Sequence, residues 1–234
     1  MDEKSLELIP TELQSSYEFH QWRNAVAVLA GVYPDEWQSL LEVLSAFRIL
    51  RTDIGELGTK GGGKSKVAIR MDRMFRERGW LPQEFDTSIL VKTLGGDVRE
   101  TKSPTHEVDC FRGKVAIELE WNNKTEFYDR DLNNFRLLFD LRVIDVGIVM
   151  TRSDELQTVF DSLGKGSSYG STTTILSKLV RKLEGGAGGG CPVLAVGMKS
   201  SLYLDDIADS SVSSLFVPIE RTTRRRRAAK TRNE

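Results

Sequence analysis

The clearest alternation of hydrophobic and polar positions lies in residues 108–120 and predicts a β-hairpin. A short strand ends near Asp109, an Arg-Gly pair follows where a turn is needed, and the next seven residues alternate. One face of the second strand is aliphatic, and the other face carries Ala116, Glu118 and Glu120. Asp109 lies at the base of the hairpin, so we expect its carboxylate beside those of Glu118 and Glu120.

The rest of the pattern predicts an α/β fold with a helical N-terminal part. Two amphipathic helices are predicted within about residues 5–50, with Pro34 at the start of the second. Residues 51–64 are predicted as a loop. Later helices are predicted at 67–78, 132–139, 154–160 and 174–183, and buried strands at 143–150 and 192–198, with a short strand or two in 80–107.

Length and composition are those of an ordinary globular protein. The chain has 234 residues, of which 39% are hydrophobic and 29% charged. We expect one domain over residues 1–218 and a basic, disordered tail over 219–234, whose charge would strengthen binding to a polyanion at low salt. The overall net charge of −1 gives no global signal for nucleic acid.

The cellular location of the protein and the redox state of its cysteines can be predicted from the sequence. No apolar run reaches the roughly 20 residues of a membrane span, and the first residues do not form the apolar stretch of a signal peptide. The two cysteines, Cys110 and Cys191, lack metal-binding spacing. We therefore expect a cytoplasmic protein, with no membrane partner, that keeps Cys110 as a buried strand thiol.

Three carboxylates converging on one volume predict a metal site. Like charges packed together need a cation, and a hard divalent ion such as Mg²⁺ suits oxygen ligands. The spacing Asp109-x8-Glu118-x-Glu120 matches the nuclease signature PD-(D/E)xK, with Glu in the final position. A surface hairpin with scattered acidic residues would show the same spacing, so the pattern alone leaves both interpretations open.

A glycine-rich segment precedes the helix predicted at 67–78. The letters from Gly58 to Ser65 match a P-loop, but no convincing buried strand precedes them and no Walker B strand is evident. Lys64 and Ser65 at a helix N-terminus would instead suit a DNA phosphate. A plain connector is the alternative, and nucleotide binding that vanished in Lys64→Ala would restore the NTPase hypothesis.

The order of these features resembles the BglII/BstYI-like family of type II restriction endonucleases. The resemblance covers roughly residues 15–200 and rests on the glycine-rich helix entry, the Asp109…Glu118-x-Glu120 centre, the Asn-Asn-Lys run at 122–124 and the Gly-Ser-Ser-Tyr run at 166–169. It implies a PD-(D/E)xK restriction-endonuclease-like core, in which a central mixed β-sheet is flanked by helices.

The resemblance also implies an activity. It indicates a homodimer that uses Mg²⁺ to cut both strands of double-stranded DNA at a short palindromic site, often with a GATC centre, leaving 5′-phosphate and 3′-hydroxyl ends. Asp109, Glu118 and Glu120 would be the catalytic and metal-binding residues. Glu120 stands where relatives carry Lys or Gln, or Glu as in BamHI, which leaves the number of metal ions open. DNA contacts are expected from Lys64, Ser65, Asn122, Asn123, Lys124, Lys165, Ser167, Ser168 and Tyr169.

Two alternatives remain beside a restriction enzyme. A repair or resolvase nuclease would use the same core, and a DNA-binding module would carry the acidic cluster for structural reasons only. His106, in the loop before the hairpin, is a further candidate for contact with DNA or with water at a metal.

Overall fold

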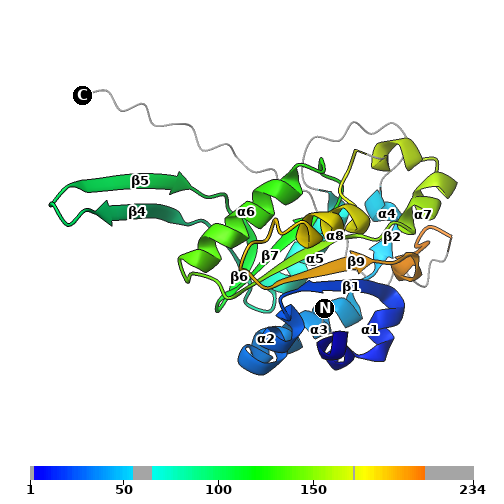
Figure 1. The fold of residues 1–234 in the computed structure, drawn as a ribbon. Coiled ribbons are helices and arrows are strands. Elements are labelled where there is room, and N and C mark those ends of the chain that lie inside the picture. Colours follow the sequence, from blue (N-terminus) through cyan, green and yellow to red (C-terminus); the bar gives the residue numbers. More distant parts are fainter. Residues whose placement is uncertain (1–2, 55–64, 171, 209–234) are drawn as a thin grey trace.

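A six-stranded mixed sheet with helices on both faces forms the centre of the computed structural model, which describes residues 3–54, 65–170 and 172–208 (Figure 1). The strand order is β1-β9-β8-β7-β6-β3. The strands span β1 Tyr17–Trp22, β3 Leu81–Gln83, β6 Val108–Arg112, β7 Val115–Glu120, β8 Val146–Arg152 and β9 Val193–Met198. This arrangement confirms the predicted fold class.

Strand direction divides the sheet into a parallel centre and antiparallel edges. β7, β8 and β9 run parallel, whereas β1 pairs antiparallel with β9, and β6 pairs antiparallel with both β7 and β3. In the register of β7 and β8, Glu118 is paired with Val149 and Glu120 with Thr151. The strands predicted at 143–150 and 192–198 are thus confirmed as β8 and β9, with small shifts at their ends.

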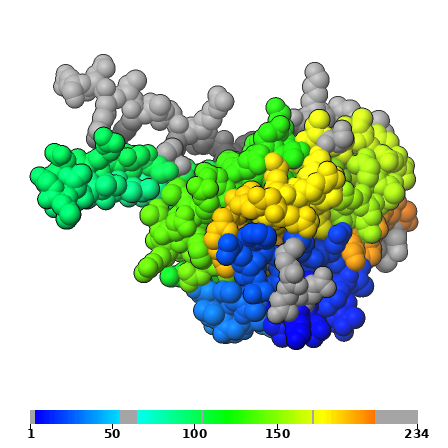
Figure 2. Space-filling view, in the orientation of Figure 1, coloured from blue at the N-terminus to red at the C-terminus, as the bar shows by residue number. Residues whose placement is uncertain are grey.

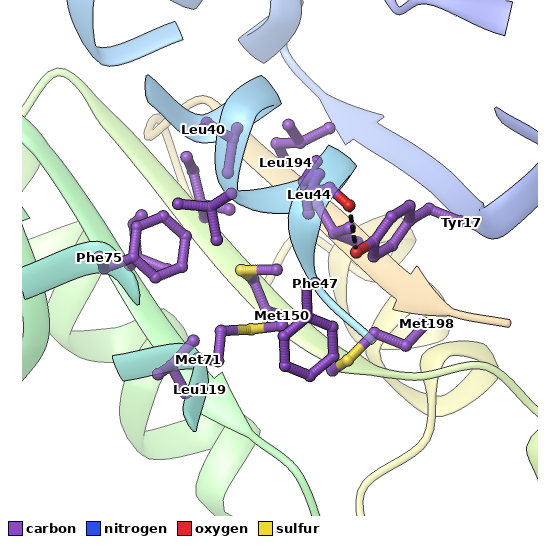
Figure 3. Packing of buried hydrophobic residues seen from close by; sticks show 14 of the residues in the cluster. Tyr17, Leu40, Leu44, Phe47, Met71, Phe75, Leu119, Met150, Leu194 and Met198 are labelled. Carbon is purple, nitrogen blue, oxygen red and sulfur yellow. Dashed lines mark hydrogen bonds between the residues drawn. The ribbon is translucent and has the colours of Figure 1, made fainter. Parts of the chain in front are cut away.

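One face of the sheet is covered by the helices that precede the hairpin in sequence. These are α1 Thr11–Ser16, α2 Ala25–Val32, α3 Pro34–Ala46 and α5 Lys66–Arg76. Their apolar side chains meet Ile117, Met150 and Leu194 in the larger hydrophobic core, part of which is drawn in Figure 3. The buried Tyr17 hydroxyl donates to the carbonyl of Leu44, which links β1 to α3.

The opposite face is covered by α6 Phe127–Asp140 and α8 Leu176–Glu184. Two strand glycines allow this close packing. A Cβ at Gly147 would lie 2.3 Å from the Phe135 ring, and one at Gly197 would lie 2.6 Å from Leu176. Because α6 crosses the sheet so closely, its first turns lie over the end of β7, where Glu118 and Glu120 are found.

The N-terminal part differs from its prediction as two helices. Residues 17–22 form β1, which continues the sheet beyond β9 in a six-residue antiparallel register. The apolar residues Tyr17, Phe19 and Trp22, assigned to a helix from the sequence, therefore lie in a strand, because hydrogen bonding to a distant strand overrides local propensity. The apolar residues that follow them are helical as expected, in α2. Residues 51–54, predicted as loop, form the short helix α4 Arg51–Ile54.

A hairpin arm extends from the sheet edge (Figures 1 and 2). It consists of β4 Asp86–Lys92 and β5 Val98–Pro104, which pair with each other as a separate two-stranded sheet. Apolar side chains on the arm face water, among them Leu90 and Leu94. Phe85, at its base, packs edge-on against Phe111 of β6. The sequence prediction of one or two short strands here missed the length of this arm.

Short elements complete the described chain. They are the 3₁₀ helices η1 Glu3–Leu8, η2 Gly166–Tyr169 and η3 Ser200–Leu202, the helix α7 Leu156–Ser162, and the paired strands β2 Ile49–Leu50 and β10 Tyr203–Leu204. Within the described ranges, every helix is too short or too polar to cross a bilayer. The predicted phosphate-binding Lys64 and the basic tail lie outside the described residues.

Candidate active site

The predicted hairpin is formed by β6 and β7. Its turn requires a left-handed residue, and Gly113 supplies φ +58° there. The predicted alternation in β7 is confirmed, because Ile117 and Leu119 join the larger core while Ala116 joins the core under α6. Glu118 and Glu120 therefore point to the α6 side of the sheet. Asp109 lies beside them, and its Oδ2 accepts a hydrogen bond from the backbone N–H of Leu119 at 3.0 Å.

Glu118 lies at the centre of the site. Its side chain is 1% exposed, and its Oε1 is 3.0 Å from His106 Nε2. His106 comes from the three-residue link between β5 and β6. The loop histidine considered from sequence is thus brought directly to a predicted carboxylate.

Helix α6 adds two residues that the sequence analysis did not assign to the site. The Asp131 side chain is fully buried, and its Oδ1 accepts from Arg130 Nη2 at 2.8 Å and lies 3.2 Å from His106 Nε2. Asp131 occupies the buried face of α6, three residues after Tyr128 and four before Phe135. A carboxylate within an apolar helix stripe was the signal that could have identified it.

Glu120 is held by residues on two sides. Asn123 Nδ2 donates to Glu120 Oε2 at 2.6 Å, and Arg130 Nη2 lies 3.5 Å from Oε1. The Arg130 side chain is about half exposed, and its guanidinium also stacks over the Phe127 ring. The cationic side chain of Arg130 therefore lies between the buried carboxylates and the solvent.

Burial shifts the pKa values of the central groups. It raises the pKa of Glu118, and the charges of Asp131 and Asp109 add to this rise. Burial likewise raises the pKa of Glu120, and Asp131 again adds to it. For His106, burial acts to lower the pKa, but hydrogen bonds to Asp131 and Glu118 outweigh it and raise the pKa to about 9. All three shifts favour the protonated forms.

The donor set fits a divalent cation. The carboxylates of Asp109, Glu118, Glu120 and Asp131 gather beside the guanidinium of Arg130 and the imidazole of His106. Within the described chain, Asp131 Oδ2 is buried and has no hydrogen-bond partner. A buried carboxylate oxygen left unpaired is costly, and oxygen-rich clusters of this kind are what hard cations bind.

Two of the segments predicted to contact DNA lie side by side next to this cluster. Asn122 Nδ2 donates to the carbonyl of Ser168 at 3.1 Å, and Lys124 forms an isolated bridge with Thr173. Asn123, Lys124, Ser167 and Ser168 are exposed. The residues that leave β7 and those around η2 therefore form one continuous rim beside Glu120.

Other predicted contact residues are less available. The Tyr169 ring is buried, stacked on Phe160 with centroids 3.8 Å apart, and Lys165 is also buried. Their side chains pack into the body instead of facing outward, which differs from their predicted role in DNA contact. Ser65 caps α5, where its Oγ accepts from the N–H of Ala68 at 3.1 Å.

Arg152 holds the η2 rim from beneath. Its side chain is buried at the end of β8, and its Nη2 donates to the Tyr169 carbonyl at 2.7 Å and to Thr173 Oγ1 at 2.9 Å. Its guanidinium also lies near the Phe160 and Tyr169 rings. Nothing in its local sequence distinguished Arg152 from the residues of an ordinary strand end.

Both cysteines are free and buried, as expected for Cys110. Burial raises the pKa of Cys191 to about 12. Neither thiol is in the carboxylate cluster, since Cys110 faces the larger core and Cys191 the core under α6 and α8.

This fold, with a carboxylate-bearing hairpin inside a mixed sheet, defines a protein of the restriction-endonuclease-like class. Residues 17–198 match the family model described as restriction endonuclease BglII/BglIII, so the chain belongs to that family. A search among curated proteins found no match. The match begins with β1 and ends with β9, the two strands that pair along their full length.

Proposed function

We propose that the protein is a type II restriction endonuclease that uses Mg²⁺ to hydrolyse both strands of double-stranded DNA at a short palindromic site. The observation that carries this proposal is the convergence of Asp109, Glu118 and Glu120 at the end of β7, beside an exposed polar rim. Membership of the BglII/BglIII family supports it.

The predicted carboxylates would hold the metal. Asp109 and Glu118 are close enough for the charge of one to raise the pKa of the other, so they are suited to share a cation. When bound, Mg²⁺ would polarise the scissile phosphate and lower the pKa of water. Asp109 also accepts from the Leu119 N–H, which fixes its carboxylate relative to β7.

Glu120 and Arg130 would act on the reacting groups. Asn123 donates a 2.6 Å hydrogen bond to Glu120, and Glu120 would position a water and accept its proton. The half-exposed guanidinium of Arg130 would bind a phosphate oxygen. In-line attack would then leave a 5′-phosphate and a 3′-hydroxyl.

The rim beside Glu120 would contact DNA. Exposed Asn123, Lys124, Ser167 and Ser168 are proposed to reach bases or phosphates, with Asn122 joining the two segments. Lys165 and Tyr169 would support the rim from inside, while Lys64 and Ser65 at the start of α5 would contact phosphate.

A palindromic site implies two subunits. A homodimer with two-fold symmetry would present one cluster to each strand. We propose a GATC-centred duplex as the first substrate to test. A reducing cytoplasm, the place where a restriction enzyme meets DNA, is consistent with the two free thiols.

Plasmid digestion tests the proposal. Incubation with supercoiled plasmid and Mg²⁺ should give discrete fragments, and sequencing their ends should give one palindromic site with a 5′-phosphate. Glu118→Ala should abolish cleavage while the protein still binds DNA. Glu107→Gln is the matched control, because this exposed acid lies beside the cluster in sequence and should leave cleavage unchanged.

Two results would contradict the proposal. A smear or structure-dependent nicking would indicate a repair nuclease instead. Full cleavage by a folded Glu118→Ala protein, with circular dichroism and dimer size unchanged, would remove the catalytic assignment.

A further inference from the structure

His106, Glu118 and Asp131 form a compact group of mixed ligands that the PD-(D/E)xK pattern does not contain. Each comes from a different element, namely the link before β6, strand β7 and helix α6. One potential ligand atom from each side chain lies within 4.8 Å of the others. Glu118 and Asp131 are fully buried, and His106 is mostly buried.

The spacing within this group suits an octahedral ion. Adjacent ligands of an octahedral ion with bonds of about 2.1–2.2 Å are about 3.0–3.1 Å apart. His106 Nε2 is 3.0 Å from Glu118 Oε1 and 3.2 Å from Asp131 Oδ1. The two distances from His106 therefore match those of neighbouring ligands, and all three ligand atoms lie within 4.8 Å of one another.

The second observation is an oxygen without a partner. Asp131 Oδ1 accepts from Arg130 and lies next to His106, but Oδ2 is buried and unpaired within the described chain. A cation bound by Asp131 would satisfy this free oxygen.

We propose that His106, Glu118 and Asp131 form a second divalent-cation site, next to the one assigned to Asp109, and that this site binds Mn²⁺ more tightly than Mg²⁺. The preference follows from the ligands, because imidazole nitrogen suits transition metals better than it suits Mg²⁺. The inference rests on the proposed function in that both sites share Glu118. It adds His106 and Asp131 as ligands and a prediction of which metal they take.

Mn²⁺ binding to the full-length protein without DNA tests this site directly. Pulsed electron paramagnetic resonance of bound Mn²⁺ should show modulation by an imidazole nitrogen. The signal should vanish in His106→Gln and persist in His20→Gln. His20 is a suitable control because the chain has two histidines and His20 lies in β1, at the opposite edge of the sheet from β6.

Calorimetry gives an independent measure. Asp131→Asn keeps the side-chain volume and should lower Mn²⁺ affinity by about tenfold or more, with a smaller effect on Mg²⁺. Mn²⁺ bound without nitrogen modulation in the wild type, or modulation that survives His106→Gln, would overturn the inference. So would unchanged Mn²⁺ affinity in folded Asp131→Asn.

The two proposals fail in different ways. If the wild type cuts plasmid at one site but Mn²⁺ shows no nitrogen modulation, the nuclease stands and the mixed site is wrong. If modulation depends on His106 but DNA is not cut, the mixed site stands and the proposed activity is wrong.

Discussion

Two hairpins follow one another in this chain and have opposite surroundings. The arm, β4 and β5, extends into water as its own two-stranded sheet, whereas β6 and β7 lie between β3 and β8 under helix α6 (Figure 1). Only residues 105–107 separate them. Glu100 on the arm is exposed, and Glu118 on β7 is buried.

The contrast shows how burial turns an ordinary carboxylate into a reactive site. A glutamate on the arm is hydrated and its charge is screened within about 10 Å by salt. The same side chain in β7 cannot reach water, so its charge must be neutralised. It can bind a proton, pair with a cationic side chain or bind a metal ion. His106, at 3.0 Å, is such a partner for Glu118, whereas Asp131 adds a further negative charge.

The largest effect is expected when one glutamate in each hairpin is replaced by glutamine and the two variants are compared. Glu120→Gln should reduce plasmid cleavage by about 10²–10⁴-fold, because it removes the proton acceptor while preserving the hydrogen-bond shape. Glu100→Gln on the arm should leave the rate unchanged. Single-turnover cleavage of the mapped site measures both, and equal rates for the two variants would refute the contrast.

A second test compares apolar side chains. Ile117→Ala in β7 should cost about 2–5 kcal/mol of unfolding free energy, because it leaves a cavity in the larger core. Ile89→Ala on β4 should change it by less than about 0.5 kcal/mol, since surface substitutions rarely exceed this. Urea unfolding decides between them, and a comparable loss in Ile89→Ala would mean that the arm is packed against the body.

A third test uses pH in the absence of metal. The pKa values of Glu118 and Glu120 are raised in the fold above the ordinary 4.5, so the folded state holds protons that the unfolded chain releases. The stabilising contribution of His106 is complete below pH 6.5 and is lost as pH rises through about 9. Unfolding free energy in EDTA should therefore fall from pH 5 to pH 9.

Added Mg²⁺ should flatten this fall, because the metal replaces the protons. Glu118→Gln should also reduce the slope in EDTA, whereas Glu100→Gln should not. Stability that rises with pH in EDTA would show that the cluster is already neutralised by its own side chains.

The smallest effect is expected from shortening the arm. Replacing residues 88–102 with Asn-Gly would join Thr87 to Ser103, which are already paired, through a two-residue turn. The Phe85–Phe111 contact remains, so unfolding free energy should change by less than about 1 kcal/mol. A loss as large as that of Ile117→Ala would make the arm part of the folding unit.

Local periodicity was sufficient to predict the carboxylate-bearing hairpin and insufficient to predict what surrounds it. The alternation in β7 and the glycine turn predicted which side chains share a face, and the structure agrees. Asp131 was missed because its place over the end of β7 depends on how α6 crosses the sheet. That crossing is set by contacts distant in sequence, such as Phe135 against Gly147.

The errors at the N-terminus and around η2 have the same origin. Residues 17–22 form a strand because they pair with β9, which is distant in the sequence. Tyr169 was expected to contact DNA because of the family resemblance, but its ring packs against Phe160 and Trp121, contacts that no local pattern reveals. Pairwise tertiary contacts, not local preferences, decided each of these positions.

The two buried thiols make the protein convenient for site-directed labelling. The thiolate is the nucleophile that attacks a thiol reagent, so Cys110 and Cys191, enclosed in separate cores, should react slowly. A cysteine introduced at Leu94, the fully exposed tip of the arm, would react first without removal of the native ones. A fluorophore or spin label placed there would report on the arm in solution against a silent background.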